Sequence, residues 1–298
     1  MAKRKVNKKT GSLLSTIVVF VICAIWFLSE PVNDNDRKTK PLSVSNANTQ
    51  VHFIDVGQGD ATLVLSDGKT LLVDTGERDD SNKLLNYLEK AGIKSLDYLI
   101  ITHPHSDHMG EATEVITKYK TENIIMPRTG SNVPASSIYR KFLQTVKNQN
   151  KKITAAKDCD FDFGDMTVSL FTSKRDHDDL NNYSVLIKLV HDENSFLITG
   201  DCEFEEEAEM LEQGFDLDVD VLKAGHHGSY TSSYNSFLKK VTPEYVVVSA
   251  GKDNPYGHPH DATVKRLKKY AKEYYCTIET GTVRFVSDGK GLSVETEK

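Results

Sequence analysis

The segment that most constrains this chain is His103-Pro104-His105-Ser106-Asp107-His108, which directly follows an apolar run at 96–102. Three imidazoles and a carboxylate in so short a stretch are ligand types that zinc and its first-row neighbours prefer. A turn after a buried strand can aim all four side chains at one point. A plain polar surface turn is the alternative, but it requires no such density of ligand types. The segment therefore predicts a metal site at the end of a strand.

Later apolar runs also end in candidate ligands. These runs, with the residues that follow them, are 195–200 with Asp201, 219–225 with His226 and His227, and 245–251 with His258. Gly200 lets the backbone turn sharply before Asp201, which suits a carboxylate shared by two metals. Asp201 is equally compatible with an N-cap of a helix over 203–211. The adjacent His226 and His227 point in different directions, so at most one of them is expected to bind a given metal.

The N-terminal region predicts a location at the cell membrane. Residues 1–12, the expected cytoplasmic tail, include five basic and no acidic side chains, and residues 13–29 are apolar and uncharged. With their uncharged flanks these residues suffice for one membrane-spanning helix of about 20 residues. A basic head before an apolar run predicts a single-pass anchor with its N-terminus inside and an extracellular domain. Secretion after signal cleavage is the alternative, but no convincing small-x-small cleavage site precedes Glu30.

The remaining chain divides into a linker and one domain. Residues 30–48 are polar, without apolar periodicity, and are expected to form a tether. Residues 49–298 alternate strand and helix patterns, which predicts two sheets covered by helices in one domain. All 43 acidic but only 32 of the 37 basic residues lie after residue 12, a net charge of about −11. This charge argues against a broad basic surface for duplex DNA.

Three minor features have ordinary explanations. The acidic run at 205–209 is expected to form a solvated helix face. The basic run at 265–269 is expected to form an amphipathic helix, with a nucleic-acid contact as the alternative. Three cysteines, Cys159, Cys202 and Cys276, lie outside the expected membrane span. Their odd number leaves at least one thiol free and does not choose a disulfide.

Taken together, the motifs resemble a known family. The segment 103–108 resembles the His-x-His-x-Asp-His signature of the metallo-β-lactamase fold. The wider set resembles the C-terminal hydrolase domain of ComEC-type DNA-uptake proteins and their free-standing relatives, and it comprises residues 53–61, 73–76, 181–184, 199–201, 226–229 and 257–259. The resemblance implies an α/β (α+β) fold, a four-layer αββα metallo-β-lactamase sandwich, with metals at the edge between the sheets.

The resemblance also implies two divalent metal ions, Zn or Mn, and a role for each ligand. The implied roles are His103 and His105 on the first metal, Asp107 and His108 on the second, Asp201 bridging both, His226 completing the second site, and Asp74 supporting the ligand histidines. Many members of the fold supply one more histidine before the bridging aspartate. Here that region is Asn181-Asn182-Tyr183-Ser184, and the nearby His177 stands in an expected solvated loop. The first metal is therefore expected to lack a ligand.

Two divalent ions would make hydroxide available near neutral pH by lowering the pKa of a shared water, and would hold the developing negative charge. Asp107 would orient that water as well as bind metal. His227 or His258 would protonate the leaving group or bind a phosphate oxygen, although a structural role is nearly as compatible for His258. Asn182 and Ser229 are weaker candidates for substrate contacts.

We therefore expect a membrane-anchored, extracellular, metal-dependent hydrolase. Its expected activity is that of a phosphodiesterase or nuclease on single-stranded nucleic acid or nucleotides. The alternatives are a phosphodiesterase on a cell-surface polymer or lipid headgroup, a lactam or lactone hydrolase, and a non-catalytic binding protein that retains the fold. No obligate protein partner is expected.

Overall fold

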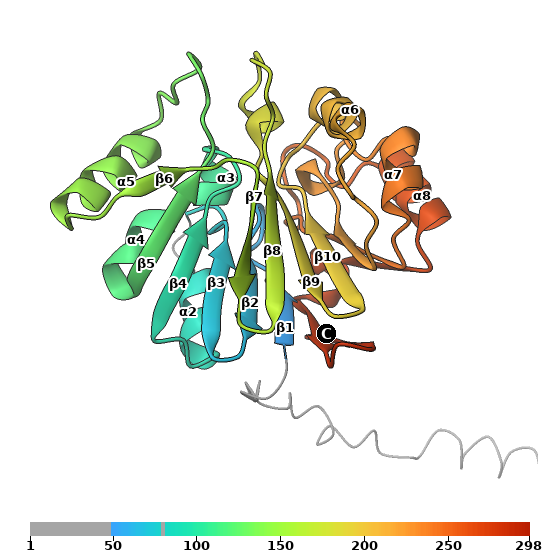
Figure 1. Cartoon of the computed structure of the whole chain (residues 1–298), viewed down its shortest axis with the longest axis horizontal. Coiled ribbons are helices and arrows are strands. Elements are labelled where there is room, and N and C mark those ends of the chain that lie inside the picture. The colour runs from blue at the N-terminus through green and yellow to red at the C-terminus, as the bar shows by residue number, and fades with distance from the viewer. Residues whose placement is uncertain (1–48, 79–80) are drawn as a thin grey trace, which may run out of the picture. The chain divides into compact units, whose positions relative to one another are not determined.

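A computed structural model describes residues 49–78 and 81–298 of the protein. In it, the apolar runs that were expected to be strands form two stacked β-sheets (Figure 1). The expected membrane span at 13–29 and the linker at 30–48 lie outside the described residues. Within those residues, no helix has the length and apolar character needed to cross a membrane.

The first sheet has eight strands in the order β15-β14-β1-β2-β3-β4-β5-β6. Their bounds are β1 Thr49–Phe53, β2 Thr62–Ser66, β3 Lys69–Val73, β4 Ser95–Ile100, β5 Lys120–Met126, β6 Ile153–Ala155, β14 Val283–Ser287 and β15 Leu292–Thr296. Strands β3 to β6 run parallel to one another, so their carboxyl ends meet at one edge of the sheet.

The second sheet has seven strands in the order β13-β12-β11-β10-β9-β8-β7. Their bounds are β7 Cys159–Phe163, β8 Met166–Phe171, β9 Leu186–His191, β10 Asn194–Ile198, β11 Val221–Lys223, β12 Tyr245–Val248 and β13 Glu273–Cys276. Strands β10 to β13 are parallel. Their carboxyl ends also meet at one edge, where a parallel sheet commonly binds its ligands.

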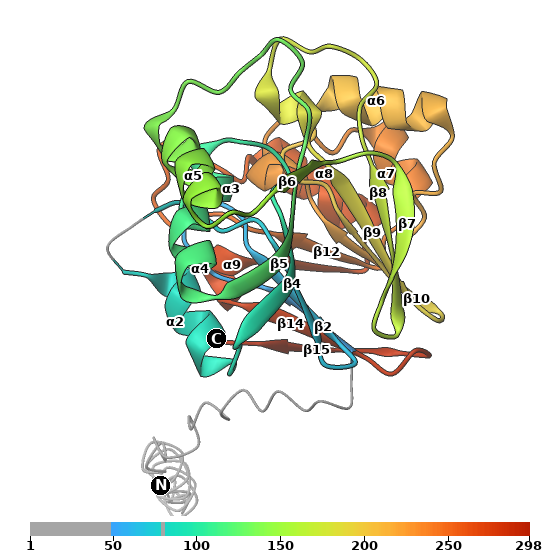
Figure 2. The ribbon, with the colours of Figure 1, turned by 60° about the vertical axis from the view of Figure 1, so that its left-hand side comes forward.

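Helices cover the outer faces of both sheets (Figures 1 and 2). Those against the first sheet are α2 Lys83–Lys90, α4 Ala112–Lys118 and α5 Ser137–Asn148, and those against the second are α6 Phe204–Gln213, α7 Asn235–Val241 and α8 Asp261–Tyr270. Short helical segments are α3 Ser106–Met109, α9 Thr277–Thr280, η2 Leu180–Tyr183 and η3 His226–Gly228. The layers therefore follow the expected order of helix, sheet, sheet and helix.

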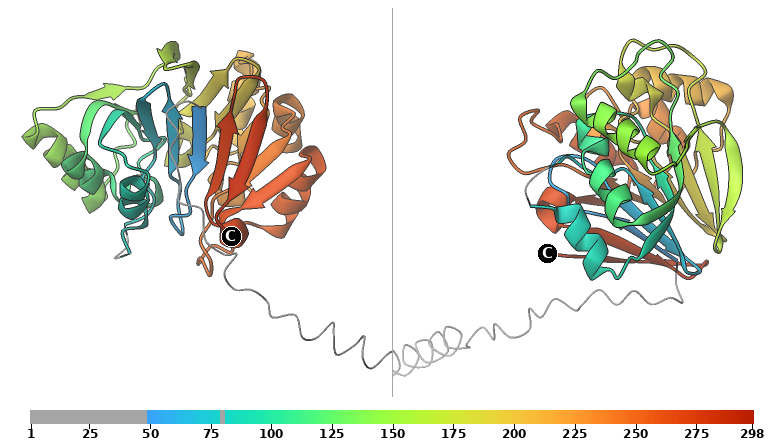
Figure 3. Two further views of the ribbon diagram at one scale, coloured as in Figure 1. Left: turned by 90° about the horizontal axis from the view of Figure 1, so that it is seen from below. Right: turned by 90° about the vertical axis from the view of Figure 1, so that its left-hand side faces the viewer.

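The two sheets stack face to face (Figure 3), and a continuous layer of buried apolar side chains between them holds them together. Phe53, Phe163, Phe196 and Phe285 are among its fully buried side chains, and burial of each such ring contributes about 1.5–3 kcal/mol. Because helices cover the outer faces, central strands are buried on both sides, and every residue of β2 is buried. This packing fixes the spacing of the loops at the shared edge.

The prediction of a solvated acidic face on α6 is wrong for Glu206, Glu207 and Glu209, which are all buried. Glu207 accepts hydrogen bonds from the backbone N–H groups of Ser233 and Tyr234, at 2.5 and 3.0 Å. Glu209 accepts from the N–H of Lys174 at 2.6 Å and from the hydroxyl of Ser173. Glu207 and Glu209 are buried because their carboxylates accept hydrogen bonds from the backbone of two loops that pack against the helix.

The expected solvated setting of His177 is also wrong, since its side chain is only 4% exposed. Its Nε2 lies 2.8 Å from Ser173 Oγ, and its ring packs edge-on against Tyr183. The three cysteines that the structure describes, Cys159, Cys202 and Cys276, are all free.

Candidate metal centre

Side chains that follow five strands converge where the carboxyl ends of the two sheets meet. Strand β4 leads to His103 and α3, β3 to Asp74, β10 to Asp201, β11 to η3 and β12 to the loop before α8. The turn at 57–60 braces this edge, because Asp60 N–H donates to the carbonyl oxygen of Asp107 at 3.1 Å. A Cβ on Gly59 would lie 2.1 Å from that oxygen, so glycine is required there.

One group of potential ligands lies around His103. Its Nε2 is 3.1 Å from His105 Nδ1 and 3.9 Å from Asp201 Oδ2. Ligand atoms that share a tetrahedral zinc ion lie about 3.4 Å apart. The spacing of these atoms is therefore compatible with a common cation.

A second group lies on the other side of Asp201. His108 Nε2 is 3.1 Å from Asp201 Oδ1, and His227 Nε2 is 3.1 Å from Asp107 Oδ2 and 3.5 Å from Asp201 Oδ2. Ligand atoms of Asp60, His108, Asp201 and His227 all lie within 4.8 Å of one another. Asp201 thus lies close to residues of both groups.

The imidazole rings of His103 and His108 are also held by hydrogen bonds at their Nδ1 atoms, on the side away from the ligand groups. His108 Nδ1 donates to Asp74 Oδ2 at 2.9 Å, and Asp74 is fixed in turn by the N–H and hydroxyl of Thr102, both at 2.7 Å. His103 Nδ1 lies 3.2 Å from Thr102 Oγ1. Because Nδ1 carries the proton in each case, the Nε2 lone pair is left for a metal. Asp74 therefore holds the ring of His108 through its Nδ1.

Unpaired polar atoms test whether these residues fit a metal. His108 Nε2 and Asp201 Oδ1 are buried, and neither atom makes a hydrogen bond of normal geometry. Burying such groups without a partner costs several kcal/mol. Their donor types and spacing fit a divalent cation, which would satisfy them directly.

The electrostatics also favour a cation. Burial of His227 disfavours its charged form and lowers its pKa, but the carboxylates of Asp201 and Asp60 outweigh burial and raise the pKa of His227 to about 10. Burial also lowers the pKa of His108, but the nearby carboxylates outweigh it and hold that pKa well above its usual value; they belong to Asp201, Asp74 and Asp107. These carboxylates attract protons to the imidazoles, and a divalent cation would displace those protons on binding.

Asp60 and Lys223 are central residues to which sequence analysis gave no role. Lys223 Nζ lies 2.5 Å from Asp60 Oδ2 and also donates a hydrogen bond to the carbonyl oxygen of Ala224. The side chains of Lys223 and Asp60 are both almost inaccessible to solvent. Asp60 Oδ1 is in turn 3.4 Å from His227 Nδ1. A lysine inside the apolar run of β11 was the available signal, since a buried lysine requires an anionic partner.

The two adjacent histidines differ from their expected assignments. His227, expected to act on the leaving group, lies in the second ligand group, where the sequence placed His226. His226 Nε2 is 3.7 Å from Asp201 Oδ2, and its Nδ1 is 3.0 Å from Glu203 Oε1. The N-cap of α6 is Glu203, so Asp201 does not serve as the helix cap.

His258 lies beside the ligands, 5.3 Å from His226 between ring centroids. Burial and the neighbouring imidazoles of His226, His227 and His260 lower the pKa of His258 to about 4. The ring is therefore neutral at pH 7, which favours hydrogen bonding to a phosphate oxygen over proton donation.

The two weaker substrate candidates are engaged within the protein. Asn182 Oδ1 accepts from the N–H groups of Glu203 and Glu206, at 3.2 and 3.4 Å. Ser229 Oγ lies 2.9 Å from Thr231 Oγ1. Both side chains thus support the loops that carry the ligands.

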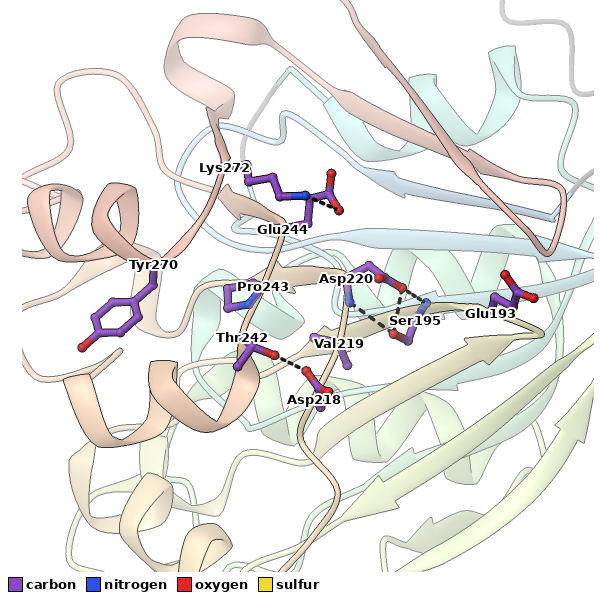
Figure 4. A pocket seen from close by; sticks show the side chains of 10 residues that line it. All are labelled: Glu193, Ser195, Asp218, Val219, Asp220, Thr242, Pro243, Glu244, Tyr270 and Lys272. Atoms are coloured by element: carbon purple, nitrogen blue, oxygen red, sulfur yellow. Dashed lines mark hydrogen bonds and ion pairs between the residues drawn. The ribbon is translucent and has the colours of Figure 1, made fainter.

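A cavity of about 450 Å³ lies away from this centre, at the amino ends of β11, β12 and β13 (Figure 4). Its polar side chains are largely paired with one another: Asp220 accepts from Ser195, Glu244 pairs with Lys272, and Thr242 donates to Asp218. The cavity therefore shows no convergent set of free catalytic groups.

Comparison with known proteins agrees with this geometry. Residues 54–252 match the metallo-β-lactamase superfamily. Among curated proteins, the chain is 30% identical to ComE operon protein 3 of Bacillus subtilis, over 79% of this chain and 33% of the relative. It is 33% identical to Recombination protein 2 of Haemophilus influenzae, over 81% of this chain and 29% of the relative. The chain thus spans about a third of the length of these relatives.

Solved structures share the fold at low sequence identity. The metallo-β-lactamase fold protein YhfI from Bacillus subtilis is 15% identical, with a TM-score of 0.55 over 80% of this chain and 100% of that chain. CmlA, a diiron β-hydroxylase from Streptomyces venezuelae, is 14% identical, with a TM-score of 0.52 over 80% and 54% of the two chains. Fold, ligand geometry and sequence agree: the chain belongs to the metallo-β-lactamase superfamily and is a relative of the ComEC-type competence proteins.

Proposed function

We propose that the protein is a metal-dependent phosphodiesterase that acts on single-stranded nucleic acid or nucleotides. The observation that carries this proposal is the pair of ligand groups that share Asp201, with His103 Nε2 at 3.9 Å on one side and His108 Nε2 at 3.1 Å on the other. When bound, two divalent cations would supply an activated water and stabilise the charge that develops on phosphorus oxygens.

The chain's own residues would position the phosphodiester. A neutral His258 lies close to the ligand histidines, with its ring centroid 5.3 Å from that of His226. A phosphate oxygen carries no proton, so the ring would bind it through an N–H. Asp107 lies beside His227 and can orient a water as well as bind a cation.

Exposed aromatic rings support a nucleic-acid substrate. Tyr256 is 61% exposed and stacks on His258, with ring centroids 5.6 Å apart. Tyr230 is 64% exposed and lies 5.0 Å from the ring of His260. Large exposed aromatic side chains are the usual platforms for unpaired bases. Two such rings beside a phosphodiester site favour a single strand over a duplex, in agreement with the acidic net charge.

The second candidate substrate is a phosphodiester that carries a quaternary ammonium group, as in a choline-bearing surface polymer or lipid. The same tyrosine rings favour it, because the face of an aromatic ring attracts a cation. The charge pattern of residues 1–29 also supports anchoring in the cell membrane with the domain outside, where such polymers occur. Lactam hydrolysis and a purely binding role remain outcomes of the same test.

The test is a panel of substrates with the purified protein, loaded with zinc or manganese. It comprises bis(p-nitrophenyl) phosphate, a single-stranded oligonucleotide, glycerophosphocholine and a β-lactam. We expect hydrolysis of the first two substrates and its abolition by EDTA or by Asp201→Asn. Glu205→Gln is the matched control, because Glu205 is 69% exposed and should retain activity.

Each alternative has its own outcome in this panel. Turnover of glycerophosphocholine without cleavage of the oligonucleotide would favour the surface polymer. Turnover of the lactam alone would replace the phosphodiesterase proposal. Metal binding with no turnover of any substrate would indicate a binding protein.

A further inference from the structure

The first turn of α8 is fixed against the loop that carries the ligand histidines. The N–H of His260 donates to the carbonyl oxygen of Gly228 at 3.1 Å, and the hydroxyl of Thr263 donates to that of Ser229 at 3.0 Å. A Cβ on Gly228 would lie 2.6 Å from the Cβ of Pro259, so the two loops are in close contact. His260 therefore has a fixed position beside the metal centre.

His260 is the N-cap residue of α8, but its side chain does not cap the helix. Serine, threonine, aspartate and asparagine usually occupy this position, because their side-chain oxygen accepts a hydrogen bond from an N–H group of the first turn. The imidazole of His260 brings α8 no such benefit. The stability of the helix therefore does not explain a histidine here.

The imidazole of His260 instead binds the backbone of the ligand loop. The N–H of Tyr230 donates to His260 Nδ1 at 3.1 Å. Because a backbone N–H cannot accept a proton, Nδ1 carries none, and the proton of the neutral ring is on Nε2. No residue that the structure describes accepts a hydrogen bond from His260 Nε2, and the side chain is partly exposed. His260 thus presents an oriented N–H donor for which the described residues supply no partner.

The rings around His260 form a row at the rim of the metal centre. His258 contacts the ligand histidine His226, with 5.3 Å between ring centroids, and His260 contacts His258 at 4.8 Å. On its other side, His260 lies 5.0 Å from the exposed ring of Tyr230. The donor is therefore one ring contact farther from His226 than His258 is, and it lies next to a ring on which a base can stack.

A phosphate of a single strand fits this arrangement. Every linkage of a nucleic acid carries a negative charge, and a hydrogen bond to a charged acceptor is stronger than one between neutral groups. A strand bound with one phosphate at the metal centre places further phosphates on either side of it. A donor one ring away from His258 suits the next phosphate along the strand.

We propose that His260 binds, through Nε2–H, the phosphate next to the scissile one, while the base between them stacks on Tyr230. This inference rests on the proposed phosphodiesterase function and deepens it, because it makes His260 a residue that selects polynucleotides. A substrate with a single phosphate, such as bis(p-nitrophenyl) phosphate, has no group for His260 to bind. The protein therefore prefers a strand of several nucleotides over small phosphodiesters.

Two substitutions separate the two nitrogens of the His260 ring. The amide of asparagine reaches the position of Nδ1, so His260→Asn keeps an acceptor for the N–H of Tyr230 but has no group at the position of Nε2. The amide of glutamine reaches the position of Nε2, so His260→Gln keeps the outward donor and loses the acceptor. A residue that only holds the Tyr230 loop would suffer more from glutamine, whereas a phosphate-binding residue suffers more from asparagine.

The assay is binding of a fluorescently labelled oligothymidylate to the full-length protein, measured by anisotropy in EDTA and again with manganese. His260→Asn should weaken binding by about 10–150-fold, the effect of losing a hydrogen bond to a charged acceptor. His260→Gln should retain most of the affinity. His191→Asn is the matched control, because His191 is also partly exposed, binds Ser287 Oγ through Nδ1 at 2.7 Å and lies at the far end of β9.

Hydrolysis gives a second measurement with the metal-loaded protein. The ratio of kcat/KM for the oligothymidylate to kcat/KM for bis(p-nitrophenyl) phosphate should fall in His260→Asn by the same factor. Most of the change should lie in the KM of the oligothymidylate, because a contact to a phosphate that does not react is made equally in the ground state and the transition state.

The proposal is overturned if His260→Asn binds the oligothymidylate as wild type does, if His260→Gln loses as much affinity as His260→Asn or more, or if wild type does not bind the oligothymidylate with or without manganese. A protein that binds in the expected pattern yet cleaves no phosphodiester would support this inference and refute the proposed function. A protein that cleaves bis(p-nitrophenyl) phosphate, with equal binding of the oligothymidylate by wild type and His260→Asn, would refute this inference alone.

Discussion

Replacing Lys223 by methionine should destabilise the metal-free protein by about 3–5 kcal/mol, because it removes the ammonium group that pairs with the buried Asp60 carboxylate. The two charged atoms lie 2.5 Å apart. At an effective dielectric constant of about 20, unit charges at that distance attract each other by about 7 kcal/mol. Part of this attraction offsets the cost of burying both groups, and the remainder is lost with the ammonium.

The assay is urea and thermal unfolding in EDTA, so that no bound cation replaces the ammonium. For a domain of this size, the expected loss corresponds to a fall in Tm of about 6–20 °C. Methionine has a similar length and an apolar tip, so the substitution leaves little unfilled space.

A double variant isolates the charge effect. Asp60→Asn combined with Lys223→Met removes both charges, and it should be more stable than Lys223→Met alone. A loss below about 1 kcal/mol for Lys223→Met, or a double variant whose loss equals the sum of the two single losses, would refute the reasoning.

Three further predictions concern other parts of the molecule. Burial raises the pKa of Glu206 well above its usual value, so the folded state binds a proton that the unfolded chain releases above pH 4.5. Glu206→Gln should therefore gain stability relative to wild type as pH rises from 5 to 7, by up to about 1.4 kcal/mol per pH unit. If urea unfolding shows a constant difference in stability between the two proteins over this range, the prediction is contradicted. Asp74→Asn should weaken one zinc ion by about 10–100-fold in competition with a chelating dye, since it disturbs the proton on His108 Nδ1; unchanged affinity would count against a supporting role. Tyr256→Ala should weaken binding of a single-stranded oligonucleotide by about 1–3 kcal/mol while sparing bis(p-nitrophenyl) phosphate; equal loss on both substrates would indicate a structural role.

The local motifs were readable because their geometry is local. The segment 103–108 follows β4 directly and forms α3, so the ligand turn needs only its own residues and the strand before it. Parallel strands place their carboxyl ends at one edge of a sheet. For this reason Asp201 and the η3 histidines lie at the same edge, whatever the packing of the two sheets.

The contacts that sequence analysis missed join distant segments. Asp60 and Lys223 meet only after the two sheets have stacked, and neither residue has a local partner that reveals the pair. Glu207 and Glu209 are buried because loops at 233–234 and 173–174 fold over α6. Amphipathic periodicity describes the helix alone, so it could not include those loops.

The sequence by itself determined the ligand types, their order along the chain and the strand ends that carry them, because these depend on residue identity and on the apolar runs that predict buried strands. Only the tertiary structure decided which imidazole faces which ligand group, because the answer depends on the sign of φ at His226 and His227 and on acceptors supplied by Glu203 and Ser249. Those acceptors lie more than 20 residues away along the chain, and they come within hydrogen-bonding distance only when the second sheet is complete.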